Sequence, residues 1–121
     1  MPKRSVELYL QDIIECIDLI AEYTVGVSQE EFFKDQQLVD AIVRRLGIVG
    51  EAAKQLPEEF RAAHPEIPWE SMIGMRNKIM HEYFGADEAI LWQTIREDIP
   101  PLRNLMVTLL HNRGTDTTQA A

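Results

Sequence analysis

The sequence has few of the features that mark secreted or membrane-spanning proteins. Its 121 residues include one cysteine, Cys16, so no internal disulfide can form, which fits a reducing cytoplasm. No apolar run approaches the roughly 20 residues that a bilayer-spanning helix needs. No secretory signal follows Pro2-Lys3-Arg4, because acidic residues interrupt the apolar positions. We therefore expect a cytoplasmic protein that does not associate with membranes.

Basic residues are also scarce. The chain has 12 Lys and Arg against 20 Asp and Glu, which gives a net charge of −8. A protein that coats nucleic acid needs a broad basic stripe, so this class is excluded. A small RNA site with local cations is still compatible with the composition, and an acidic surface suits a basic protein partner.

Signals for a metal or a cofactor are missing. The three histidines, at positions 64, 81 and 111, show no paired metal-ligand spacing, and there is no second cysteine. The chain contains neither a Gly-rich phosphate loop nor a Gly-x-Ser-x-Gly elbow. We therefore expect no metal site and no cofactor.

What the sequence does have is helical periodicity along most of its length. The spacing predicts long helices over 5–23, 36–56, 69–84, 87–96 and 102–111, and short helical turns near 28–33 and 57–63. Ile99-Pro100-Pro101 is expected to interrupt the helical structure. These elements predict an all-α bundle of four to five helices in one domain, 1–112, followed by a flexible tail, 113–121.

Small residues indicate a helix end at one place and a close contact between helices at another. Gly26 is expected to end the first helix. Gly47, Gly50 and Ala52-Ala53 lie inside the second long helix, where small side chains allow a neighbouring helix to approach closely.

The most informative segment is the predicted helix over 69–84. Arg76 projects close to the middle of its apolar stripe, and a guanidinium there is costly unless it has a partner. His81 follows, and histidine is the side chain whose unperturbed pKa lies near neutrality. A fixed cation beside a proton carrier suits chemistry on a phosphodiester. The stripe consists of Trp69, Met72, Met75, Ile79, Met80 and Tyr83.

The spacing of these polar residues limits how they can cooperate. On a straight helix, Arg76 and His81 point about 140° apart, whereas Asn77 and His81 share a face. One chain therefore does not bring the pair together easily. Either the helix bends near His81, or a two-fold dimer of motif helices places two Arg-His pairs in one cleft.

Each of these residues also has a purely structural explanation. Arg76 could be a buried arginine tied to a carboxylate such as Glu51 or Glu22. His81 could be a solvated histidine on a helix face, and Tyr83 a core tyrosine with its hydroxyl at the rim. The functional interpretation therefore depends on their combination.

That combination resembles a known signature. Arg76-Asn77-x-x-x-His81-x-Tyr83 resembles the R-N-x-x-x-H motif of HEPN domains. The likeness is closest to the HepT-like branch, the toxin half of HEPN–nucleotidyltransferase toxin–antitoxin pairs. It extends to further segments in the same order, including Gly50-Glu51-Ala52-Ala53-Lys54 and Ile67-Pro68-Trp69.

The resemblance implies a HEPN-type bundle that forms a homodimer with the motif helix at the two-fold interface. It implies a metal-independent endoribonuclease, with Arg76 and His81 as catalytic residues and Asn77 as a supporting one. It also implies a type VII-like toxin–antitoxin system, in which a cognate MNT-type nucleotidyltransferase neutralises the toxin by transferring AMP to Tyr83. Two alternatives stay open: a non-catalytic helical binding subunit of a nucleotidyltransferase complex, and a plain structural bundle.

Overall fold

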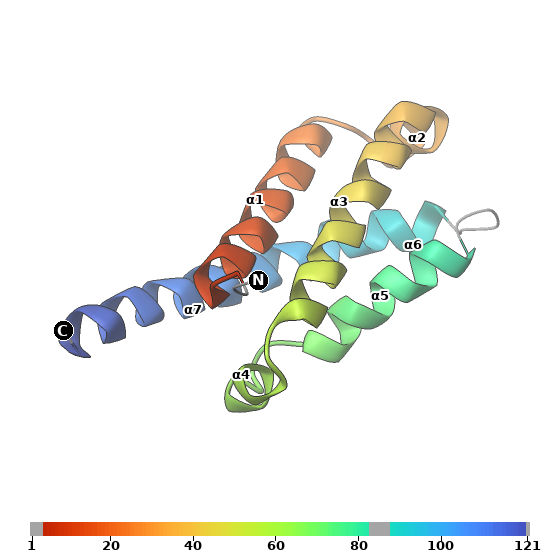
Figure 1. Ribbon diagram of the computed structural model, residues 1–121. Helices are drawn as coiled ribbons and strands as arrows, with labels where there is room; N and C mark the ends of the chain where they lie inside the picture. Colours follow the sequence, from red (N-terminus) through yellow and green to blue (C-terminus); the bar gives the residue numbers. More distant parts are fainter. Residues whose placement is uncertain (1–3, 83–87, 121) are drawn as a thin grey trace.

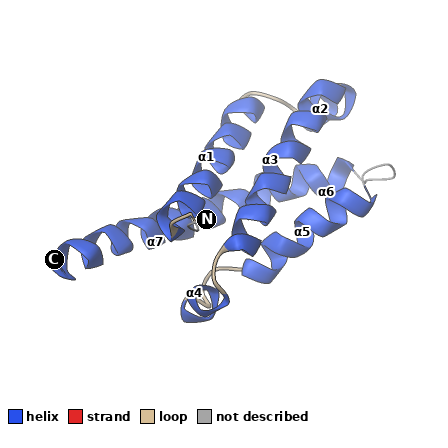
Figure 2. Cartoon of the chain, viewed as in Figure 1, coloured by secondary structure: helices blue, strands red, loops and turns tan. Residues whose placement is uncertain are grey.

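The chain folds as a helical bundle. The computed structural model describes the backbone of residues 4–82 and 88–120, and the side chains of residues 4–76 and 88–113. Within these ranges every regular element is a helix (Figure 2), which confirms the predicted all-α class. The elements are α1 (Val6–Thr24), α2 (Gln29–Lys34), α3 (Gln36–Gln55), α4 (Glu58–Ala63), α5 (Trp69–Glu82), α6 (Glu88–Gln93), the π-helical turn η2 (Thr94–Asp98) and α7 (Ile99–Ala120).

The helix α3 is the centre of the bundle. It packs against α1 on one side and against α5 on the other, and α7 packs against α1 (Figure 1). The short helices α2 and α4 lie at opposite ends of α3, and α7 extends beyond the rest of the bundle. This arrangement places the segment that carries Arg76 directly beside α3.

Local sequence signals explain where the helices begin and end. Gly26 has φ of 71°, a left-handed conformation that suits glycine and follows the end of α1, as predicted. Ser28 and Glu31 form a capping box, with Glu31 N to Ser28 Oγ and Ser28 N to Glu31 Oε1 both 3.1 Å. Asp35 accepts a hydrogen bond from the Leu38 amide at 3.1 Å and so caps α3.

The core forms where the apolar faces of these helices meet. The apolar positions of α1 and α3 are largely buried, and Trp69 and Met72 bring the first two turns of α5 into the same core. The largest fully buried side chains are Phe32, Leu10, Ile13, Ile17, Ile20, Ile42, Leu46, Leu56, Met72 and Met106, with Val39 and Val49.

The expected break at Ile99-Pro100-Pro101 was wrong. The chain remains helical from α6 through η2 into α7, and the Ile99 amide donates to the Thr94 carbonyl. Both prolines fall in the first turn of α7, where a missing N–H costs least. The π-helical turn before them carries an extra residue, and such turns are places where a helix can kink without ending.

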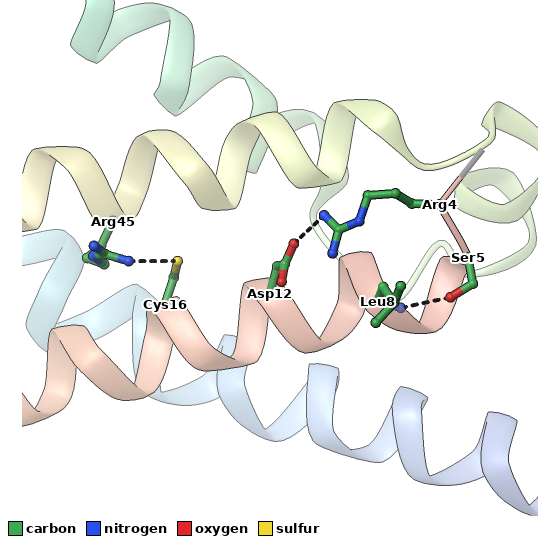
Figure 3. A network of polar contacts seen from close by, with 6 residues as sticks. All are labelled: Arg4, Ser5, Leu8, Asp12, Cys16 and Arg45. Atoms are coloured by element: carbon green, nitrogen blue, oxygen red, sulfur yellow. Dashed lines mark hydrogen bonds and ion pairs between the residues drawn. The ribbon is translucent and has the colours of Figure 1, made fainter. Parts of the chain in front are cut away.

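Polar contacts along α1 hold the neighbouring segments against it (Figure 3). Arg4 Nη1 lies 2.6 Å from Asp12 Oδ2, and Arg45 Nη1 of α3 lies 3.9 Å from the sulfur of Cys16. Cys16 is buried, and this burial raises the pKa of its thiol. Cys16 is therefore a small residue of the core.

In the part of the chain that the structure describes, no helix combines the length and the apolar character that a membrane span needs.

Candidate functional site

The site begins with an unusually close contact between α3 and α5. A Cβ atom built on Gly50 would lie 2.4 Å from the Cβ of Arg76 and 2.8 Å from the carbonyl oxygen of Met72. Carbon atoms in contact are ordinarily separated by about 3.5–4.0 Å, so only glycine fits between these backbones. The predicted close approach is therefore confirmed at Gly50. It is not confirmed at Gly47, where a Cβ would meet nothing within 4 Å.

This contact sets the position of Arg76, which forms an ion pair with the next residue of α3. Arg76 Nε lies 2.8 Å from Glu51 Oε2, and the two side chains are 30% and 45% exposed. The Glu51 Oε2 atom itself is buried, and within the described part of the chain it accepts no well-aligned hydrogen bond. We therefore treat the contact as an ion pair. Of the two carboxylates considered from the sequence, Glu51 is the partner of Arg76.

A further polar residue supports this pair. Gln55 Nε2 donates to Glu51 Oε1 at 3.1 Å, so both oxygens of the carboxylate have a neighbour. Gln55 was not among the site residues predicted from the sequence. The available signal was its spacing, because residues four apart lie on the same face of a helix.

Arg76 and Glu51 form one wall of a groove along the outer face of α3, with a volume of about 540 Å³. Its lining contains two arginines and two carboxylates, whose formal charges cancel. A cationic cleft around Arg76 is therefore not formed by these residues alone, and any excess positive charge must come from other groups. The lining consists of Asp40, Val43, Arg44, Gly47, Ile48, Glu51 and Arg76.

The positions of the other predicted site residues are not tested by the described part of the structure. Asn77 and His81 belong to the last turns of α5, but their side chains lie outside the described residues, and Tyr83 lies outside them entirely. The convergence of these groups with Arg76 stays a prediction, as does the two-fold dimer. Among the described residues, no three His, Cys, Asp or Glu side chains are grouped closely enough to hold a metal ion.

Comparison with known proteins identifies the family. The family model described as "Ribonuclease HepT-like" matches residues 13–109, which include the whole α3–α5 contact. The chain belongs to the HepT-like ribonuclease family. This confirms the resemblance drawn from Arg76 and the residues that follow it.

Two relatives show the extent of the HepT-like similarity. The chain is 48% identical over 101 residues to "Probable ribonuclease HepT" of Thermococcus cleftensis, covering 84% of this chain and 92% of that protein. It is 44% identical over 102 residues to "Putative RNase TTE0752" of Caldanaerobacter subterraneus subsp. tengcongensis, covering 84% and 91%. No solved structure matches the chain significantly.

Proposed function

We propose that this HepT-like protein is a cytoplasmic, metal-independent endoribonuclease and the toxin of a type VII-like toxin–antitoxin system. The observation that carries the proposal is the position of Arg76. Its side chain lines a groove, is 30% exposed, and belongs to the segment that matches the ribonuclease family. A guanidinium in that position can be reached by a phosphate from solvent.

The proposed reaction uses the nucleophile that RNA already carries. The 2′-oxygen attacks the adjacent phosphorus, the bond from phosphorus to the 5′-oxygen breaks, and a 2′,3′-cyclic phosphate forms. One group must accept the proton of the 2′-hydroxyl, and another must donate a proton to the leaving 5′-oxygen. The expected products are therefore a cyclic phosphate end and a free 5′-hydroxyl.

The roles of the residues follow from their chemistry. Arg76 binds two phosphate oxygens through parallel N–H bonds and stabilises the charge that develops on them. His81 acts as the base or the acid, with Asn77 as a supporting polar group, and a homodimer supplies a second histidine for the other proton transfer. General acid–base catalysis of this kind typically contributes about 10²–10⁴-fold.

The charge of the protein sets the expected strength of RNA binding. The net charge of −8 repels RNA at long range, and the groove beside Arg76 carries as many carboxylates as arginines. RNA binding must therefore depend on a few local phosphate contacts, which weaken as salt rises. An RNA affinity that stays constant between low and moderate salt would contradict this account.

The proposed control of the activity is covalent. A nucleotidyltransferase of the MNT type transfers AMP from ATP to the hydroxyl oxygen of Tyr83, and pyrophosphate leaves. Tyr83 follows the proposed base by two residues, so a bulky anionic adenylate there would exclude RNA by volume and by charge. Mass spectrometry after co-expression with the cognate transferase should find the adenylate mass on Tyr83. Full neutralisation without this modification would instead indicate simple occlusion.

The nuclease proposal is tested by cleavage of RNA in the presence of EDTA. Arg76→Ala and His81→Ala should each abolish cleavage while the protein remains folded. The matched control is Arg103→Ala, because Arg103 Nε also pairs with a carboxylate, that of Asp18, and the two side chains are 46% and 48% exposed. Loss of activity in the Arg103 variant, or full activity in the Arg76 and His81 variants, would refute the assignment.

One observation favours a second candidate, in which the protein is a non-catalytic binding subunit and Arg76 is only structural. The ion pair with Glu51 is the contact that this view requires. The double variant Arg76→Glu with Glu51→Arg separates the two. A structural pair predicts that the exchange restores both stability and every function of the protein. A phosphate-binding Arg76 predicts that stability recovers and RNA cleavage does not.

A further inference from the structure

Arg44 is the second arginine of the groove beside Arg76, and its surroundings differ from those of Arg76. It lies on α3 and is exposed, and within the described part of the chain no carboxylate forms an ion pair with it. The acidic residue at helical spacing from Arg44 is Asp40, four residues earlier. Asp40 Oδ1 already accepts a hydrogen bond from Gln36 Nε2 at 2.8 Å. The charge of Arg44 is therefore available to an anion in the groove.

The geometry of α3 separates Arg44 from Arg76 along the groove. Glu51, the ion-pair partner of Arg76, comes seven residues after Arg44. Seven residues are close to two helical turns, so the two side chains lie on the same face of α3, roughly 10 Å apart along its axis. Gly47 lies between them, and a Cβ there would meet nothing within 4 Å. The groove is therefore open between its two arginines.

We propose that Arg44 is a substrate-binding residue, which contacts a backbone phosphate of the RNA strand to one side of the cleavage point. This inference rests on the proposed ribonuclease function and adds a contact to the one assigned to Arg76. A strand advances roughly 3.4 Å per phosphate when stacked and more when extended, so the contacted phosphate lies about two to three nucleotides from the scissile one. A guanidinium suits this contact, because its planar donors match the oxygens of a phosphate.

The rest of the lining favours contact with the RNA backbone over recognition of bases. Val43, Gly47 and Ile48 supply the uncharged part of the groove, and among the described residues that line it none has an aromatic side chain on which a base could stack. Phosphate contacts fix the position of a strand but carry no sequence information directly. Arg44 is therefore expected to strengthen the binding of different RNA sequences to a similar extent.

The test compares two neighbouring arginines of α3. Arg44→Gln and Arg45→Gln each remove one positive charge from a chain whose net charge is −8, so they change the long-range repulsion of RNA equally. Arg45 is the matched control, because its Nη1 lies 3.9 Å from the sulfur of Cys16 on α1 and it is not among the residues that line the groove (Figure 3). Arg44→Lys keeps the charge and serves as the conservative variant.

Binding is measured with the full chain and a fluorescent 2′-O-methyl RNA of about eight nucleotides, which is long enough for both contacts and lacks the 2′-hydroxyl nucleophile. Arg44→Gln should weaken binding about 3- to 5-fold at low salt. It should also reduce the slope of log affinity against log salt by about 0.7, the contribution of one phosphate in a single strand. Arg45→Gln and Arg44→Lys should keep a slope near that of the parent. Equal slopes for the parent and Arg44→Gln would refute the contact.

Replacing the phosphates one at a time locates the contact. An uncharged methylphosphonate at one flanking position should weaken binding to the parent, and the same replacement should cause Arg44→Gln no further loss. If the losses from Arg44→Gln and from every methylphosphonate are additive, Arg44 acts only through net charge or through the fold, and the inference is wrong.

Cleavage of ordinary RNA separates this inference from the proposed function. In EDTA, Arg44→Gln should raise KM about 3- to 5-fold while kcat stays near the parent value, because the contact is made equally before and during the reaction. A large loss of kcat in folded Arg44→Gln would contradict a binding role. A parent protein that cleaves no RNA but shows the Arg44-dependent salt slope would refute the nuclease and leave the RNA contact established. Cleavage with a salt slope that does not depend on Arg44 would do the reverse.

Discussion

The close contact at Gly50 allows a sharp test, because α3 contains a second glycine that lacks such a contact. A Cβ at Gly50 would lie 2.4 Å from the Arg76 Cβ, whereas a Cβ at Gly47 would meet nothing within 4 Å. The two positions are three residues apart in the same helix. Alanine at each position therefore changes helix propensity equally and packing very differently.

The magnitudes follow from these distances. Alanine is favoured over glycine inside a helix by about 1 kcal/mol, so Gly47→Ala should stabilise the protein by about 0.5–1 kcal/mol. At Gly50 the same gain in helix propensity is offset, because α5 must move away from α3 by roughly 1 Å to restore ordinary contact distances. Overpacking of this kind costs about 1–3 kcal/mol. The difference between the two variants isolates this cost, because their propensity gains cancel.

Urea denaturation measures the effect directly. The free energy of unfolding should be about 1–3 kcal/mol lower for Gly50→Ala than for Gly47→Ala, with similar m-values. In a domain of this size, each kcal/mol corresponds to roughly 4 °C in melting temperature. If Gly50→Ala proves as stable as Gly47→Ala, α3 and α5 do not approach as closely as described, and the reasoning from this contact is refuted.

Three further predictions concern other parts of the fold. Hydrogen bonding to its own backbone, and then to Arg113, lowers the pKa of Glu7, and the capping box lowers the pKa of Glu31. The unfolded chain therefore binds more protons, so stability should fall as pH drops below the ordinary value of 4.5, and Glu31→Gln should weaken this dependence in acid titrations. The buried Cys16 thiol, with its raised pKa, should react with a thiol reagent at neutral pH only when the protein unfolds. Gly26→Ala should lower the free energy of unfolding by about 1 kcal/mol, because φ of 71° strains a side chain; an unchanged melting curve would contradict this.

The local features of the fold could be predicted from the sequence because their causes are local. A capping box needs only Ser28 and Glu31 at the correct spacing, and Asp35 caps α3 through its own side chain. Gly26 ends α1 through a backbone conformation that other residues avoid. The all-α class followed from the same kind of evidence, since apolar periodicity reports which face of each helix is buried.

The continuous helix through Pro100 and Pro101 could not be predicted in the same way. Proline is judged from the sequence by what it does to a regular α-helix, and there it breaks the hydrogen-bond ladder. The π-helical turn from Thr94 to Asp98 changes that ladder just before the prolines. Buried Ile95, Ile99 and Leu102 hold this irregular segment against the core, and such tertiary support has no local signature.

The carboxylate partner of Arg76 could not be chosen from the sequence either, because it depends on tertiary packing. The sequence identified Arg76 and proposed either Glu51 or Glu22 as its carboxylate, because both lie on helices with no spacing rule that favours one. The choice depends on which helix approaches α5, and Gly50 decides it by allowing α3 to come within contact distance of the Arg76 backbone. The same glycine was noted as a small residue, but its neighbour in space could not be named.

The structure also changes how the two explanations of Arg76 relate to each other. They were posed as alternatives, in which the guanidinium either pairs with a carboxylate or acts on a phosphate. Yet Arg76 keeps 30% of its side chain exposed at a groove while its Nε lies 2.8 Å from Glu51 Oε2. A core arginine would be enclosed on every side, since burying a charge is tolerated only with complete pairing. An ion pair at the edge of a groove instead leaves part of the arginine side chain accessible to solvent, so the pairing is compatible with the proposed chemistry and does not compete with it.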